Sequence, residues 1–90
     1  MAYIYISDTT ESSVSAYLKG LDTNYSQTIR SLFWKIYEYG SSTVVKSSSE
    51  YMSNGISETP ERTWSGLDPD TRYEIEAKIT NIGGSSDVYL

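Results

Sequence analysis

Apolar and polar residues alternate without interruption along residues 73–80, which gives the clearest pattern in the chain. Four apolar residues share one set of alternating positions: Tyr73, Ile75, Ala77 and Ile79. The positions between them are polar or charged. Because successive side chains of a strand point to opposite faces, this period of two predicts a β-strand with one face in the core and one in water.

Turn signals stand on both sides of this segment. Pro69 lies between Asp68 and Asp70, and this combination predicts a reversal of the chain over residues 67–71. Gly83-Gly84 predicts a second turn over residues 81–85. The remaining residues, 86–90, are then a short last strand.

Shorter alternations predict further strands in the first two thirds of the chain. Residues 2–7 form an edge strand with Ile4 and Ile6 on one face. Two serine-rich stretches, 41–42 and 47–49, are expected to be loops. The other predicted strands centre on Val14, Ala16 and Leu18, on Leu32, Trp34 and Ile36, on residues 43–46, and on residues 62–65 around Trp64.

A helical interpretation competes for two of these segments. One helical stripe contains Ile29, Leu32, Phe33, Ile36 and Tyr37, with Gly40 as a stop, and another contains Val14, Tyr17, Leu18 and Leu21. Ser, Thr, Val and Tyr are frequent in the chain, and this composition favours strands. We therefore expect an all-β fold, a seven-stranded antiparallel β-sandwich, formed by residues 1–90 as a single domain of a longer chain.

Composition removes several kinds of chemistry. The chain contains no His and no Cys, which excludes Ser-His and Cys-His nucleophile pairs and ordinary zinc, haem or iron–sulfur sites. The net charge is -5 and the seven basic residues are dispersed, so we expect no nucleic-acid partner. No apolar run approaches the length of a membrane span, so we expect no membrane insertion. We predict no enzymatic activity and no cofactor.

The segment Ser65-Gly66-Leu67-Asp68-Pro69-Asp70-Thr71-Arg72-Tyr73-Glu74-Ile75 resembles a fibronectin type III domain, an immunoglobulin-like β-sandwich. The resemblance implies seven short strands in two sheets, and it implies that Tyr73 forms a tyrosine corner at the start of the sixth strand. The chain departs from the family in its tryptophan, because Trp34 lies on the expected third strand and Leu18 is nearest the usual place. The residues expected to hold the fold together are Trp34, Leu67, Pro69, Tyr73 and Ile75.

Aromatic residues are the best candidates for ligand binding. Phe33, Tyr37 and Tyr39 alternate with the apolar residues of the third strand, so we expect them on its outer face. Such a strip can stack on sugar rings or anchor a protein partner. The alternative is cross-strand pairing that only stabilises the sheet.

Three other features have both a functional and an ordinary interpretation. Asp68 and Asp70, with Asp22 or Asn24, would suit calcium, although turn chemistry around Pro69 also explains them. Glu74 and Glu76 would suit a glycosidase carboxylate pair or a solvated strand face. Asn24-Tyr25-Ser26 matches a glycosylation sequon, a sequence that also arises by chance.

These observations favour a static role. We expect a non-catalytic structural spacer or protein-binding module of a larger extracellular or surface-exposed protein, with neighbouring domains, proteins or glycans as partners. Domains that look like this are common in bacterial surface proteins, secreted glycan-active enzymes and phage virions. The alternative is a carbohydrate-binding accessory module that uses Phe33 and Tyr37 as a stacking platform.

Overall fold

The computed structural model describes residues 2–21, 30–52, 55–81 and 86–89. These residues form antiparallel strands and connections, with no helix among them. The expectation of an all-β fold is therefore confirmed for this part of the chain. The helical interpretation is wrong for the described residues of both segments, because residues 14–19 and 30–38 are extended and paired with neighbouring strands.

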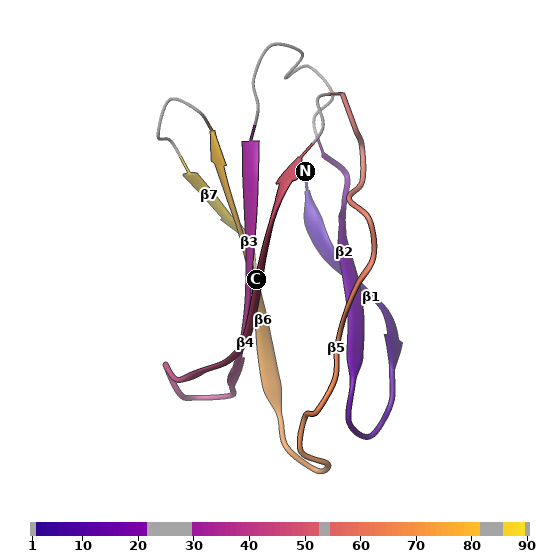
Figure 1. The fold of residues 1–90 in the computed structure, drawn as a ribbon, viewed down its shortest axis with the longest axis vertical. Helices are drawn as coiled ribbons and strands as arrows, with labels where there is room; N and C mark the ends of the chain where they lie inside the picture. The colour runs from indigo at the N-terminus through magenta and orange to yellow at the C-terminus, as the bar shows by residue number, and fades with distance from the viewer. Residues whose placement is uncertain (1, 22–29, 53–54, 82–85, 90) are drawn as a thin grey trace.

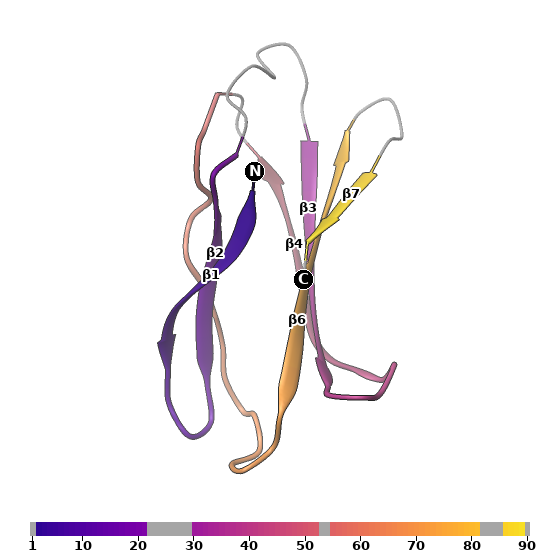
Figure 2. The ribbon, with the colours of Figure 1, turned by 180° about the vertical axis from the view of Figure 1, so that it is seen from behind.

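The strands belong to two antiparallel sheets that lie face to face (Figure 1, Figure 2). One sheet has the order β1-β2-β5 and the other has the order β4-β3-β6-β7. Strands β1 and β2 are consecutive and form a hairpin. After β4 the chain crosses from the second sheet to the first, where β5 pairs with β2. The bounds are β1 Tyr3–Thr9, β2 Val14–Lys19, β3 Arg30–Glu38, β4 Val44–Met52, β5 Arg62–Trp64, β6 Tyr73–Asn81 and β7 Ser86–Tyr89.

Two tryptophans fill the space between the sheets. Trp34 on β3 is fully buried, and its ring centroid lies 5.2 Å from that of Trp64 on β5. Val14 and Ile75 are partly buried residues packed against the same core. The predicted burial of Trp34 is thus confirmed. The other buried core residues come from both layers: Ala16, Leu18, Leu21, Leu32, Ile36, Met52, Ala77 and Ile79.

Strand β4 is much longer than the sequence pattern predicted. We expected a strand over residues 43–46 and a loop at Ser47–Ser49, but β4 continues to Met52 and pairs with β3 throughout. The loop prediction was wrong because it relied on composition. Three inward positions of β4 hold polar side chains, Lys46, Ser48 and Glu50, so the usual apolar alternation is hidden although the pairing with β3 runs without a register shift from Lys46 to Met52.

Strand β1 contains an irregularity that changes which side chains face inward. Its pairing with β2 shifts register between Ile6 and Asp8, where Ser7 is the extra residue. Ile4 is half-buried as expected, but Ile6 retains 45% of its exposure. A bulge of this kind bends an edge strand and limits its pairing with other chains.

Candidate functional site

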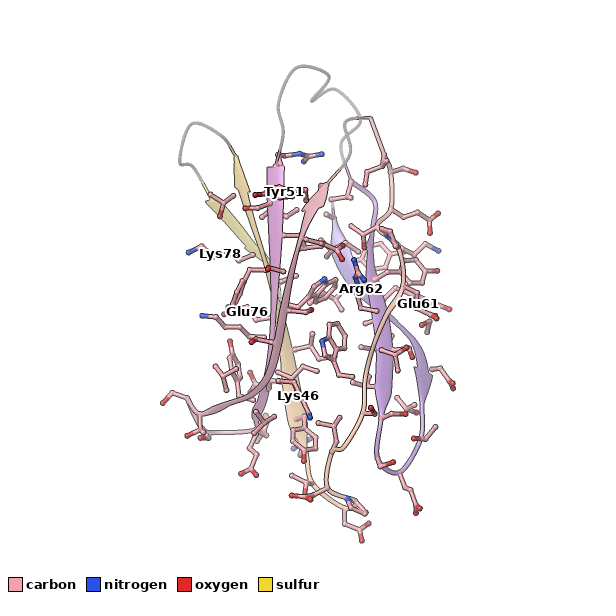
Figure 3. The ribbon with its side chains drawn as sticks, viewed as in Figure 1. Lys46, Tyr51, Glu61, Arg62, Glu76 and Lys78 are labelled. Carbon is pink, nitrogen blue, oxygen red and sulfur yellow. The ribbon has the colours of Figure 1, made fainter. Side chains whose placement is uncertain are left out.

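The outer face of β3 presents the aromatic residues that the sequence pattern singled out. Phe33 and Tyr37 point away from the core on either side of Lys35, because all three alternate with the buried residues of this strand. Their neighbours on β6 are charged: Phe33 pairs with Lys78, and Lys35 pairs with Glu76. Figure 3 shows Glu76 and Lys78 extending from the same outer side of the sheet.

Tyr37 is engaged with the neighbouring strand. Its hydroxyl donates a hydrogen bond of 2.7 Å to Oε1 of Glu76. This hydrogen bond, followed by desolvation and by the negative charges of Glu76 and Glu74, raises the pKa of Tyr37 to about 12. The neutral phenol is therefore the form that this site stabilises. The contact fits the cross-strand interpretation of Tyr37, since the hydroxyl is already occupied.

Tyr39 lies beyond the end of β3 and does not extend the strip. Its backbone N–H donates to the carbonyl oxygen of Arg72 at 2.9 Å. The guanidinium carbon of Arg72 lies 4.6 Å from the centroid of the exposed Tyr39 ring. This cation–π contact joins the β3–β4 connection to the start of β6. Of the three predicted residues, Phe33 and Tyr37 share the outer face, whereas Tyr39 belongs to the turn.

Tyr51 is an exposed aromatic residue that the sequence analysis missed. It lies on β4 opposite Ser31, and 84% of its surface is exposed. Phe33 pairs with Ser49, so Tyr51 is its diagonal neighbour on the same face. We did not predict that Tyr51 lies on a strand, because it follows the serine run that we expected to be a loop. We call Phe33, Tyr37 and Tyr51 the outer aromatic face.

A second aromatic group lies on the other sheet and was also missed. The rings of Tyr5 on β1 and Tyr17 on β2 are 5.3 Å apart, and Nζ of Lys19 lies 4.9 Å from the Tyr5 centroid. Tyr3 is exposed on the same strand face as Tyr5. The sequence contained a signal for this group, because the tyrosines alternate with Ile4 and Leu18.

The turn before β6 contains the expected contact of a tyrosine corner. The backbone N–H of Asp68 donates to the hydroxyl oxygen of Tyr73 at 2.8 Å, and Leu67 is buried beside the turn. The structure thus has a hydrogen bond between Tyr73 and the backbone of this turn, in which the hydroxyl is the acceptor and not the donor. Asp70 has a φ of 56°, in the left-handed region, where Asp is better tolerated than most residues. These contacts agree with the turn interpretation of Asp68 and Asp70.

The calcium and glycosylation hypotheses depend on residues whose structure is not described. Asp22 and Asn24, including the sequon that begins at Asn24, lie outside the described residues. Within the described ranges, no group of three or more carboxylates is placed to hold a metal ion. Glu74 and Glu76 occupy the outer side of β6, where Glu76 accepts the hydrogen bond from Tyr37.

The two layers are joined by polar contacts along the side formed by β4 and β5. Arg62 on β5 forms an ion pair with Glu50 on β4, and Nε1 of Trp64 donates to the Ser48 hydroxyl at 3.4 Å. Figure 3 shows Arg62 directed from β5 toward β4. These contacts explain why β4 places polar residues at inward positions.

Comparisons with known proteins found no matching family model, no similar curated protein and no similar solved structure. In the part of the chain that the structure describes, no helix has the length and apolar character needed to cross a membrane.

Proposed function

We propose that the chain is a seven-stranded sandwich of the fibronectin type III kind. Two features support this assignment. The hydrogen bond between Tyr73 and the backbone of Asp68 has the form of a tyrosine corner. Strand β4 pairs with β3 and not with β5, which differs from a constant-type immunoglobulin domain, where the fourth strand joins the sheet of the first, second and fifth.

We further propose that this domain is a non-catalytic protein-binding or spacer module of a larger extracellular or surface-exposed protein, such as a cell-surface or virion protein. The observation that supports binding is the exposure of Phe33 and Tyr51 as diagonal neighbours on adjacent strands. Large aromatic residues contribute most of the binding energy at protein interfaces when a partner covers them. The residues paired with the two rings have small side chains, because Ser49 lies opposite Phe33 and Ser31 lies opposite Tyr51.

Charges around the two rings would orient a partner. Lys78 lies opposite Phe33 on β6, and Nζ of Lys35 lies 5.6 Å from the Phe33 centroid. Glu76 is adjacent but is held by the Tyr37 hydroxyl. The proposed partner surface therefore offers apolar area for Phe33 and Tyr51 and carboxylates for the two lysines.

The second candidate is a carbohydrate-binding module, and it uses the same exposed rings. Tyr37 is a weaker stacking residue than we expected because its hydroxyl is bound to Glu76. Phe33 and Tyr51 would provide the platform in its place, since both side chains are exposed. This candidate predicts binding to soluble oligosaccharides in the absence of any protein partner.

The double substitution Phe33→Ser with Tyr51→Ser tests both candidates. The control is Tyr3→Ser, which removes an exposed ring from the other sheet. We expect the double variant to remain folded. Within the parent protein, the double variant should no longer bind the partner, whereas the Tyr3→Ser control should still bind it. Binding of oligosaccharides by the wild type, lost in the double variant, would assign the glycan role. Equal partner binding by all three proteins would contradict the protein-binding proposal, and a wild type that binds no oligosaccharide would contradict the glycan candidate.

A further inference from the structure

Three tyrosines and a lysine share the outer face of the β1–β2 hairpin. Tyr5 on β1 is paired directly with Tyr17 on β2. The next pair on this face is Tyr3 with Lys19. Tyr3 and Tyr5 are exposed, whereas Tyr17 and Lys19 are half-buried. Because the strand residues between them pack against the core, the four side chains project from the opposite side of the sheet. We call these four residues the tyrosine face.

The ammonium group of Lys19 lies next to two of the aromatic rings. Its Nζ is 4.9 Å from the ring centroid of Tyr5 and 6.0 Å from that of Tyr17. The two rings are themselves in contact, with centroids 5.3 Å apart and an interplanar angle of 57°. Within the described residues, Lys19 forms no ion pair with a carboxylate. The tyrosine face therefore combines aromatic surface with a positive charge that has no described carboxylate partner.

The phenol hydroxyls of this face are available to a ligand. Tyr37 and Tyr73 use their hydroxyls in hydrogen bonds to other parts of the chain. The hydroxyls of Tyr3, Tyr5 and Tyr17 have no hydrogen-bond partner among the residues that the structure describes. A phenol can donate one hydrogen bond and can also accept. Hydrogen-bonding groups therefore accompany the aromatic surface and the positive charge.

The border of the tyrosine face is also polar. On the same sheet, the hydroxyls of Ser15 and Thr63 are 2.7 Å apart, and the Ser7 hydroxyl donates to Oε2 of Glu61. The outer aromatic face differs, because it includes the exposed aliphatic residue Val44. Aromatic rings bordered by hydroxyl groups suit a sugar, whose C–H groups pack on the rings while its hydroxyls form hydrogen bonds.

The short distance between charge and ring favours one class of sugar. In a uronic acid the carboxylate is bound directly to the pyranose ring, so charge and packing surface lie within one sugar residue. Its carboxylate can pair with Lys19 while its ring packs on Tyr5. The net charge of -5 opposes an anionic ligand at long range. At physiological ionic strength, however, exposed charges more than about 8 Å apart are largely screened, whereas a contact with the half-buried Lys19 is screened less.

We propose that the tyrosine face binds a uronate-containing polysaccharide. Sugar rings pack on Tyr5 and Tyr3, and Lys19 holds a carboxylate of the ligand. Tyr17 positions the Tyr5 ring through the contact between the two rings. The tyrosine face lies on the sheet of β1, β2 and β5, whereas the outer aromatic face lies on the other sheet. The proposal therefore does not depend on the function proposed for the outer aromatic face.

The probe is trigalacturonate, titrated into the isotope-labelled chain at physiological ionic strength and followed by NMR. We expect the largest chemical-shift changes at Tyr5, Tyr17 and Lys19. Two control ligands separate charge from packing. The methyl ester of trigalacturonate keeps the sugar rings without the charge, and acetylated, amidated triglutamate keeps the carboxylates without the rings. Both should bind about fivefold more weakly or less, because each loses one of the two contributions.

Two variants remove the charge and the ring in turn. Lys19→Gln and Tyr5→Thr should each weaken trigalacturonate binding by about fivefold or more. Their matched controls are Lys35→Gln and Phe33→Thr on the other sheet, where Nζ of Lys35 lies 5.6 Å from the Phe33 centroid. Both controls should leave the affinity within about twofold, and Lys19→Arg should retain most of it because it keeps the charge.

The amide spectrum of each variant shows whether the chain is folded. If Tyr5→Thr is unfolded, Lys19→Gln and Lys35→Gln decide the proposal between them. Equal weakening in these two lysine variants, equal affinity for the methyl ester, or largest shifts on the outer aromatic face would overturn the proposal. So would the lack of a saturable shift with trigalacturonate. Binding of triglutamate as tight as that of trigalacturonate would also overturn it, and would point to an acidic protein as the partner.

Discussion

Thr59 makes a side-chain hydrogen bond that substitutes for strand pairing, and Thr59→Val tests how much that bond contributes to stability. The backbone N–H of Leu18 donates to the Thr59 hydroxyl at 3.0 Å, and the N–H of Thr59 donates to the Leu18 carbonyl at 3.0 Å. The segment before β5 thus follows the edge of β2 without being a strand itself. Both residues are buried, with Leu18 fully covered and Thr59 5% exposed.

The burial of this contact sets the magnitude. Valine keeps the branched shape of threonine, so the substitution creates no cavity and removes only the oxygen. The Leu18 N–H would then be buried without a partner, and an unsatisfied buried donor costs about 1–3 kcal/mol. For a domain of this size that loss is a large fraction of the free energy of unfolding.

Denaturant unfolding of the wild type, Thr59→Val and Thr59→Ser separates the hydroxyl from the methyl group. Thr59→Ser keeps the acceptor and loses one methyl group, so it should cost less than about 1 kcal/mol. The Leu18 amide should also exchange faster in Thr59→Val than in Thr59→Ser. If Thr59→Val were as stable as the wild type, or if Thr59→Ser were the more damaging change, the hydrogen bond would not be the stabilising element.

Three further predictions follow from the core and the β3–β6 pair. Tyr73→Phe removes the hydroxyl that accepts from the Asp68 N–H, and this N–H lies in an exposed turn where water can take the place of the hydroxyl. Denaturant unfolding should therefore show that the free energy of unfolding falls by about 0.5–1.5 kcal/mol. A larger loss would mean that the corner is buried. Trp34→Ala should cost about 3–5 kcal/mol and leave little folded protein, as measured by circular dichroism. The pKa of Tyr37 is about 12 in the folded chain against 10.0 ordinarily. The stability that the neutral phenol adds to the folded state is therefore complete below pH 10 and is lost as pH rises to about 12. Tyr37→Phe should remove that part of the pH dependence of unfolding, and an unchanged profile would contradict the hydrogen bond to Glu76.

The strands with an apolar inner face could be predicted from the sequence, and the polar strand could not. Residues 73–80 and the segments around Leu18 and Trp34 show a period of two because both sheets bury one face. Most of β4 has no such pattern, because Ser48 and Glu50 meet Trp64 and Arg62 from the other layer. The contact that makes a polar inward face stable is long-range, so no local pattern reports it.

The candidate site was predictable only in part for the same reason. Phe33 and Tyr37 were placed correctly because they alternate with buried residues of a strand that was recognised. Their different surroundings depend on β6 and β4: Glu76 occupies the Tyr37 hydroxyl, whereas Ser49 leaves Phe33 open. Tyr51 required the register of β4, which the sequence pattern did not show.

The edge strands β4 and β1 are protected from pairing with other chains by different means. On the β4 side, Lys46 and Glu50 point inward from an edge strand, and inward charges discourage pairing with another chain. On the β1 side, the register shift near Ser7 bends the edge strand, and such a bend limits its pairing with another chain. Strand β4 is thus protected by charge and β1 by backbone geometry, so each of these two edge strands discourages self-association by a different means.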